Sequence, residues 1–361
     1  MLAQDSLSLD GQLSGWMHYN PSNELNLYTG VRYIPELNLM VPLQHDRFLD
    51  VEVSANIFGT AGFQPFDTMH TDGMIKLYRT WVRYATPQLE VRLGLQKINF
   101  GSASLLRPLM WFDQIDPRDP LQLTDGVWGV LARYYFLNNT NLWLWTLYGN
   151  ENLKGWESMP SVKNIPEYGG RIQVPVPKGE MALSYHHRTA QSTAWPDSVY
   201  QFDRIPENRF GFDIKVDARV GVWLEASWSH FSEDLGSLTN QYLLNAGWDY
   251  TFGLGNGLGV IFEQLVASSH EKAFHFSQAT TFSLISVTYP VGLFDQLSTI
   301  IYYDWSNGKA YSFLNWHRQF NKISLYVMGY MNPKEYYIPT QGTGEILYAG
   351  TGLQIMAVFH H

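Results

Sequence analysis

The sequence contains no cysteine among its 361 residues. The absence of cysteine excludes disulfide bonds, thiolate-bound metals, covalently attached c-type haem and cysteine nucleophiles. Charged residues are also few, at 16% of the chain, whereas ordinary soluble domains contain roughly 25%. The formal net charge of -9 argues against nucleic acid as a partner, because binding to phosphates requires a basic surface.

Long apolar runs are missing as well. The sequence has no stretch of about 18 consecutive apolar residues, the minimum expected for a transmembrane helix. The first residues, Met1–Gln4, lack the basic and apolar regions of a signal peptide. We therefore expect that a signal was removed from the mature protein.

Aromatic residues, by contrast, are abundant: 13 Trp, 22 Tyr and 20 Phe make up 15% of the chain. The mean hydropathy of -0.19 is too polar for a helical membrane protein, but it fits a membrane barrel, whose outward apolar and inward polar residues average out. Such barrels carry girdles of aromatic rings at headgroup depth. The candidates for these girdles lie near predicted strand ends: Tyr19, Tyr33, Phe58, Tyr84, Trp128, Phe136, Tyr250, Phe252, Tyr289, Trp305 and Phe320.

Apolar and polar residues alternate with period 2 along the whole chain, which indicates β-strands. The clearest run is 49–57, where Leu49, Val51 and Val53 alternate with polar neighbours. The pattern predicts about 18 strands, most of them near the 9–11 residues that a tilted strand needs to cross a bilayer. Their ranges are 7–19, 24–40, 47–59, 73–86, 88–98, 127–136, 141–149, 168–176, 179–188, 208–218, 220–231, 240–252, 257–269, 278–289, 295–305, 309–320, 321–332 and 346–359.

Short and long connections alternate between these strands. The longer ones are 60–72, 99–126, 150–167, 189–207, 232–239, 270–277 and 333–345. Long extracellular loops and short periplasmic turns are typical of outer-membrane barrels. We therefore predict an all-β fold: a single transmembrane, antiparallel up-and-down barrel over 1–359, with 16 strands as the alternative count and both termini periplasmic. The N-terminal hairpin is the least secure pair, because Pro35 and Pro42 interrupt its second strand.

The last predicted strand has a further mark. Leu353, Ile355, Ala357 and Phe359 share one face, followed by His360 and His361. This pattern resembles the closing segment of bacterial outer-membrane proteins, which the barrel assembly machinery recognises. The resemblance implies three partners: the barrel assembly machinery, the lipid bilayer and lipopolysaccharide. The two histidines look like the remnant of a purification tag.

The region 89–136 carries a second resemblance. Arg92, Gly94, Gln96, Ile98 and Gly101 precede a long segment with Asp116, Pro117 and Asp119, and Phe100 stands where related sequences often have Trp. The pattern is similar to that of outer-membrane porin families, including alginate-export-like and phosphate-selective-porin-like barrels. It implies a porin-type barrel. The large strand number leaves an aqueous lumen rather than a core filled by side chains, which predicts a channel for passive or substrate-preferring diffusion of small polar solutes.

The segment 99–126 is long enough to fold into the barrel and narrow it, and loops of this length are usually functional. Its charged residues would then face wall arginines and create a transverse field that tunes which solutes pass. The candidates for this constriction are Arg92, Arg107, Asp113, Asp116, Arg118, Asp119 and Arg133. The alternative is a rigid surface turn, pinned by prolines, in which the aspartates cap short turns.

Charges of both signs also occupy the inward positions of other strands, among them Arg32, Glu225 and Glu263. This mixture argues against a dedicated anion channel and against a fatty-acid conduit. The histidines lie in no nucleophile or metal motif, so we predict no enzyme activity, no cofactor and no metal site. The rival hypothesis is a barrel plugged by its loops that acts as a structural or assembly partner. The tryptophans Trp143, Trp145, Trp156 and Trp195 would suit a protein partner at the extracellular loops, or sugar stacking.

Overall fold

The computed structural model describes residues 6–64, 69–192, 202–276, 279–334 and 347–361. They form 18 strands. The strands of the first half are β1 (Ser6–Tyr19), β2 (Leu27–Leu43), β3 (Arg47–Phe63), β4 (Met69–Ala85), β5 (Leu89–Gln96), β6 (Val127–Tyr135), β7 (Asn141–Leu147), β8 (Glu167–Val176) and β9 (Gly179–Ala190). Those of the second half are β10 (Ile205–Asp217), β11 (Gly221–Phe231), β12 (Asn240–Phe252), β13 (Leu258–His270), β14 (Thr280–Pro290), β15 (Asp295–Asp304), β16 (Lys309–Gln319), β17 (Ile323–Met331) and β18 (Thr351–His360).

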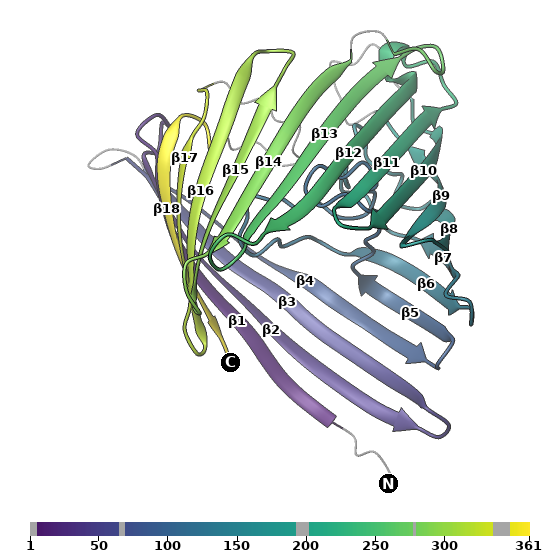
Figure 1. Ribbon diagram of the computed structural model, residues 1–361. Helices are drawn as coiled ribbons and strands as arrows, with labels where there is room; N and C mark the ends of the chain where they lie inside the picture. Colours follow the sequence, from purple (N-terminus) through teal and green to yellow (C-terminus); the bar gives the residue numbers. More distant parts are fainter. Residues whose placement is uncertain (1–5, 65–68, 193–201, 277–278, 335–346) are drawn as a thin grey trace.

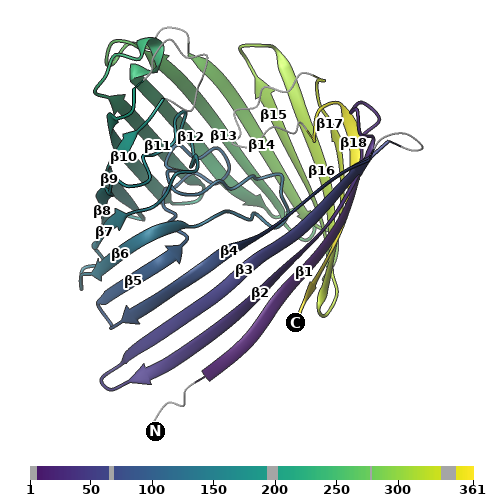
Figure 2. The same cartoon turned by 180° about the vertical axis from the view of Figure 1, so that it is seen from behind.

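The sheet closes on itself, because β1 pairs antiparallel with both β2 and β18. Figures 1 and 2 show this closed barrel from opposite sides. The predicted all-β antiparallel barrel and the count of 18 strands are confirmed, and the alternative of 16 strands is wrong. A short 3-10 helix, Gly236–Thr239, lies between β11 and β12. Among the described residues, no helix is long and apolar enough to cross a membrane.

Short and long connections alternate around the barrel. Strand β1 starts, and β18 ends, at the rim that carries the short turns 44–46, 177–178 and 320–322, at the lower end of the barrel in Figure 1. The longest described connections, 97–126 and 148–166, belong to the opposite rim. One predicted loop, 60–72, is wrong: β3 continues to Phe63 and β4 starts at Met69, and these two residues pair with each other.

The N-terminal hairpin forms despite its prolines. Pro35 lies within β2 and pairs with Gly11 of β1. On its other side the β2–β3 register passes from Tyr33↔Ile57 to Glu36↔Ser54, skipping Ile34 and Pro35. Next to this point β3 carries a register shift between Ser54 and Ala55. Proline has no N–H to donate to the hydrogen bonds between strands. A strand therefore tolerates proline best where its pairing is interrupted or shifted, as it is here.

The final strand shows how the two faces of the wall differ. Leu353, Ile355 and Phe359 are 44%, 44% and 38% exposed on the outside, and Ala357 is exposed on the same face. Between them Met356 and Val358 are buried inside the barrel. The strand continues through His360, and the backbone of His361 exchanges hydrogen bonds of 3.1 and 3.2 Å with Gly11.

Candidate functional site

The loop of residues 97–126 folds into the barrel and crosses it, from β5 and β6 to the wall formed by β10–β13. Glu225 of β11 is fully buried and accepts backbone hydrogen bonds from three loop residues. The donors are the N–H groups of Ser102, Ala103 and Leu109, at 2.7, 2.8 and 2.6 Å. A carboxylate with this many short N–H bonds holds the loop backbone firmly, because hydrogen bonds to a charged acceptor are roughly twice as strong as neutral ones.

Glu263 of β13 makes a second attachment of the same kind. It is also fully buried, and it accepts the N–H groups of Ser104, Leu105 and Leu106, with distances of 2.5–2.7 Å for the first and last. Asn245 of β12 donates to the Leu106 carbonyl at 2.8 Å. Three adjacent strands therefore bind one stretch of loop backbone inside the barrel.

The first pair of predicted constriction charges lies within the loop itself. Arg107 and Asp113 form an ion pair at 3.2 Å, and their side chains are 8% and 1% exposed. Arg107 also donates to the side chain of Asn99 and to the Phe100 carbonyl. Burial raises the pKa of Asp113, while the positive charge of Arg107 opposes that rise. These contacts fix the shape of the loop.

The next three candidates lie at the far end of the loop. Arg118 binds both oxygens of Asp116, with the closest contact at 2.6 Å. Asp119 accepts the N–H groups of Leu121 and Leu123 at 3.0 and 3.3 Å. Burial raises the pKa of Asp119, and these hydrogen bonds and Arg32 oppose the rise. The loop thus combines features of both sequence interpretations, since it folds inward and its aspartates also cap turns.

Arg92 and Arg133 lie on the wall, where their ion-pair partner is Glu90 at 3.2 and 3.7 Å. Each guanidinium also stacks on an indole ring, Arg92 over Trp81 at 4.5 Å and Arg133 over Trp143 at 3.9 Å. The structure groups them with β4–β7 near the short-turn rim, and no ion pair among the described residues joins them to the carboxylates of the loop.

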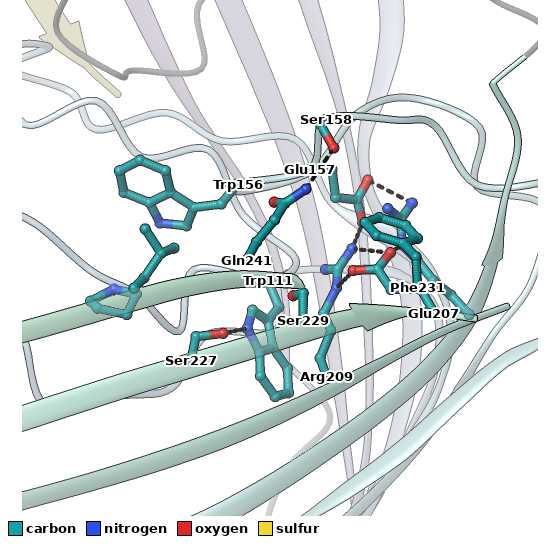
Figure 3. A pocket seen from close by; sticks show the side chains of 13 residues that line it. Trp111, Trp156, Glu157, Ser158, Glu207, Arg209, Ser227, Ser229, Phe231 and Gln241 are labelled. Atoms are coloured by element: carbon teal, nitrogen blue, oxygen red, sulfur yellow. Dashed lines mark hydrogen bonds and ion pairs between the residues drawn. The ribbon is translucent and has the colours of Figure 1, made fainter. Parts of the chain in front are cut away.

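A second loop, 148–166, binds to the neighbouring wall. Its Glu157 accepts ion pairs from Arg188 of β9 at 3.3 Å and from Arg209 of β10 at 3.0 Å, and all three side chains are almost completely buried. Both arginines also bind Glu207. Figure 3 shows Arg209, Glu207 and Glu157 turned toward one another beneath the loop. Buried charges need such partners, because an unpaired charge in the interior is very costly.

Aromatic side chains fill the space between the two loops and the wall of β6–β11. Phe100 and Phe112 pack on Trp145 with ring centroids 5.6 and 5.4 Å apart, and Trp111 donates to the Ser227 hydroxyl at 3.0 Å (Figure 3). The cavity at this point is about 20 Å³, space for about one water molecule. Trp145 is only 3% exposed, and Trp195 lies outside the described residues. The expected role of the four tryptophans in sugar stacking or partner binding stays a prediction.

The other half of the barrel is open. A cavity of about 740 Å³, here called the Arg32 cavity, lies between Asp116 and Asp119 and the wall of β1–β4 and β18. Arg32 projects into it between the rings of Trp16 and Phe58, each 5.4 Å from the guanidinium carbon. Sequence analysis placed Arg32 on the inner wall without assigning it to the constriction. It assigned Phe58 to an outer girdle, which is wrong.

A second cavity, here called the Asn315 cavity, lies on the other side of the same loop segment. Its volume is about 320 Å³, and it separates Pro117–Gln122 from the wall of β14–β17. Together the two cavities follow the wall from β14 round to β4. The barrel is therefore a closed 18-stranded cylinder whose loops fill the interior on one side and leave two cavities on the other, beside a buried apolar cluster on β13–β17.

The fold is that of the outer-membrane porins. An anion-selective porin from Comamonas acidovorans superposes with a TM-score of 0.53 at 11% identity, over 99% of this chain and 100% of that chain. OccK5 of Pseudomonas aeruginosa gives a TM-score of 0.57 at 12% identity, over 99% and 97%. OmpT of Vibrio cholerae, solved in a trimer form, gives 0.55 at 9% identity, over 99% and 100%. The sequence matches no protein-family model and no curated protein, and the resemblance to alginate-export-like and phosphate-selective-porin-like barrels is not confirmed by these comparisons.

Proposed function

We propose that this chain is a diffusion channel of a bacterial outer membrane, through which small hydrophilic solutes pass beside the loop segment 116–122. The observation that carries the proposal is the uneven interior. Inside β9–β12 the cavity beneath the loops is about 20 Å³, whereas cavities of about 740 and 320 Å³ lie beside β18–β4 and β14–β17. A barrel of this strand number encloses more space than side chains fill, and the two cavities along one wall support a path for solutes there.

The proposal places the outer face of the barrel in lipid. Exposed apolar side chains such as Leu144, Leu183 and Leu314, which are 54%, 58% and 51% exposed, point outward. In this orientation the termini and short turns are periplasmic, and the long loops meet lipopolysaccharide. Leu353, Ile355, Ala357 and Phe359 then stay the proposed signal for the barrel assembly machinery.

The geometry supports a transverse field between Asp119, one of the constriction candidates from the sequence, and Arg32, which was not among them. Arg32 on the wall and Asp119 on the loop flank one cavity, and the positive charge of Arg32 acts on Asp119. Arg107 and Asp113 are buried inside the loop and position it. Fixed charges at a constriction bias which ions pass, so Arg32 and Asp119 are the proposed selectivity residues.

The test is single-channel recording of the purified protein in planar bilayers, with zero-current potentials measured in a KCl gradient. We expect stepwise conductance, with Arg32→Gln shifting the selectivity toward cations and Asp119→Asn toward anions. Two unit charges about 4 Å apart interact by about 1 kcal/mol in water, so the permeability ratio should change by about fivefold or less. The control is Lys163→Gln, since Lys163 is 54% exposed and paired with Glu151 outside both cavities.

The same recordings, repeated at several pH values, test the contribution of the Asp119 charge to the selectivity. Because burial raises its pKa above the usual value of 3.8, its negative charge is lost at a higher pH than that of an exposed aspartate. The wild-type channel should therefore shift toward anions on acidification, and Asp119→Asn should lack this step. A folded protein that conducts no current would instead support the plugged barrel that acts through partners.

A further inference from the structure

The wall of the Asn315 cavity carries an unusual run of uncharged polar side chains. Three cross-strand pairs place them together: Thr288 lies opposite Ser298, Ser298 opposite Asn315, and Gln296 opposite His317. All five line the cavity. In the described part of the chain, the side chains of Thr288, Gln296, Ser298 and Asn315 have no hydrogen-bond partner. They are therefore free to bind a solute that enters.

An aromatic surface adjoins this polar run. His317 of β16 and Tyr326 of β17 are cross-strand partners, and their rings stack with centroids 4.5 Å apart and planes 12° from parallel. Both line the cavity. Two parallel rings in fixed register present a flat, rigid surface, because each ring restricts the rotation of the other.

Charged groups reach this cavity from the loop. Arg118 and Asp119 face the wall from the other side, between Pro117 and Pro120. Arg118 is already bound by both oxygens of Asp116, and Asp119 accepts two loop N–H groups. An ionised carboxylate has about four acceptor sites, so Asp119 retains capacity for a hydroxyl donor from a solute.

The two cavities differ in the solutes that they suit. The Arg32 cavity has Arg32, Asp72 and Lys76 on its wall, which supply counter-charges to ions. The strands that line the Asn315 cavity contribute Ser, Thr, Asn, Gln, His and aromatic side chains with Ile300 and Met328, but no carboxylate, Arg or Lys. Its charged lining residues, Arg118 and Asp119, belong to the loop. An ion that enters it loses hydration and meets only Arg118 and Asp119, which already have partners in the loop, whereas a hydroxyl exchanges water for an amide or hydroxyl partner.

We propose that the Asn315 cavity binds uncharged polyhydroxylated solutes, sugars and sugar alcohols, with a ring face on His317 and Tyr326 and hydroxyls on Ser298, Asn315 and Gln296. The inference rests on the proposed channel function and names a solute class for it. Ions take the Arg32 side of the loop segment and sugars take the Asn315 side. Several hydroxyl groups bound at once compensate for the small net contribution of each single hydrogen bond.

The test measures how strongly sucrose reduces the single-channel current. The comparison is the reduction caused by a polyethylene glycol of the same hydrodynamic radius. The polymer reports excluded volume alone, so the excess reduction by sucrose measures binding. We expect an excess in the wild-type channel. Asn315→Leu and Tyr326→Leu, which retain much of the side-chain bulk, should weaken it, with the half-effect concentration rising about fivefold for the hydrogen bond lost in Asn315→Leu.

Two controls separate the outcomes. Leu314→Ala lies beside Asn315 on the outer face, where Leu314 is 51% exposed, and it should retain the wild-type sucrose effect. Arg32→Gln should change ion selectivity and retain the sucrose effect. A conducting channel in which sucrose acts no more strongly than the polymer would overturn the sugar inference and leave the channel intact. A folded wild-type protein without conductance would overturn the proposed function itself.

Discussion

Two glutamates attach the central loop to the wall. Glu225 and Glu263 are fully buried, and each accepts hydrogen bonds from three backbone N–H groups. Such an acceptor cannot be replaced by a neutral amide without loss, because one oxygen becomes an NH₂ group that faces an N–H donor. The residues that hold the proposed constriction in place are thus different from those that face the solute.

We predict that Glu225→Gln and Glu263→Gln each destabilise the loop attachment by about 2 kcal/mol, within the range for buried hydrogen bonds to a charged group. The open-channel current should become noisier, and the temperature at which the folded band disappears on unheated gels should fall. Glu180→Gln is the control, because Glu180 is exposed and binds only Gln173 among the described residues. Steady currents in both variants would show that the carboxylates do not hold the loop.

The sequence predicts that these glutamates face inward, but it does not predict that they bind the loop backbone. Period-2 alternation places Glu225 and Glu263 on the polar face of their strands. Which donors they meet depends on contacts with residues more than 110 positions away, such as Ser102 for Glu225. In the same way the sequence identified Arg107 and Asp113 as charges of one loop but did not show that they neutralise each other.

At the level of elements, alternation predicted the number and order of the strands well because each wall residue faces either outside or inside. It failed where composition is ambiguous. Residues 60–63 and 69–72 are mostly small or polar, so they were assigned to a loop. In the barrel Leu27 at the start of β2 pairs with Phe63, so β3 continues to Phe63 along its neighbour. Phe63 in turn pairs with Met69, so β4 starts there. Backbone ladders, rather than side-chain pattern, set these strand ends.

The loop 97–126 is the element that narrows the barrel. We predict that replacing residues 102–123 with a short Gly-Ser linker raises the single-channel conductance several-fold, while the barrel still folds, because the backbone ladders of β5 and β6 do not depend on the loop. Replacing 271–276, which is exposed throughout, in the same manner should leave conductance unchanged. Equal conductance of the loop variant and the wild type would remove the loop from the solute path.

For the whole molecule, the decisive property is that the two halves of the interior differ. The loops and buried ion pairs fill the side of β6–β11. The side from β14 round to β4 contains two cavities, together with a buried cluster of apolar and aromatic side chains on β13–β17. Neither composition nor alternation distinguishes the two halves, because inward residues of both are polar or aromatic. The difference arises from where the loops 97–126 and 148–166 bind.

This asymmetry predicts which inward positions a water-soluble reagent reaches. The chain contains no cysteine, so a single introduced thiol is the only target. Thr60→Cys and Asn315→Cys, on the walls of the two cavities, should react rapidly with a charged methanethiosulfonate and lower the current. Ser227→Cys and Ser184→Cys, on the filled side and 7% and 5% exposed, should stay unmodified by mass spectrometry. Equal labelling of all four positions would mean that the loops detach from the wall of β6–β11 in solution. The whole cross-section of the barrel would then be open to solutes.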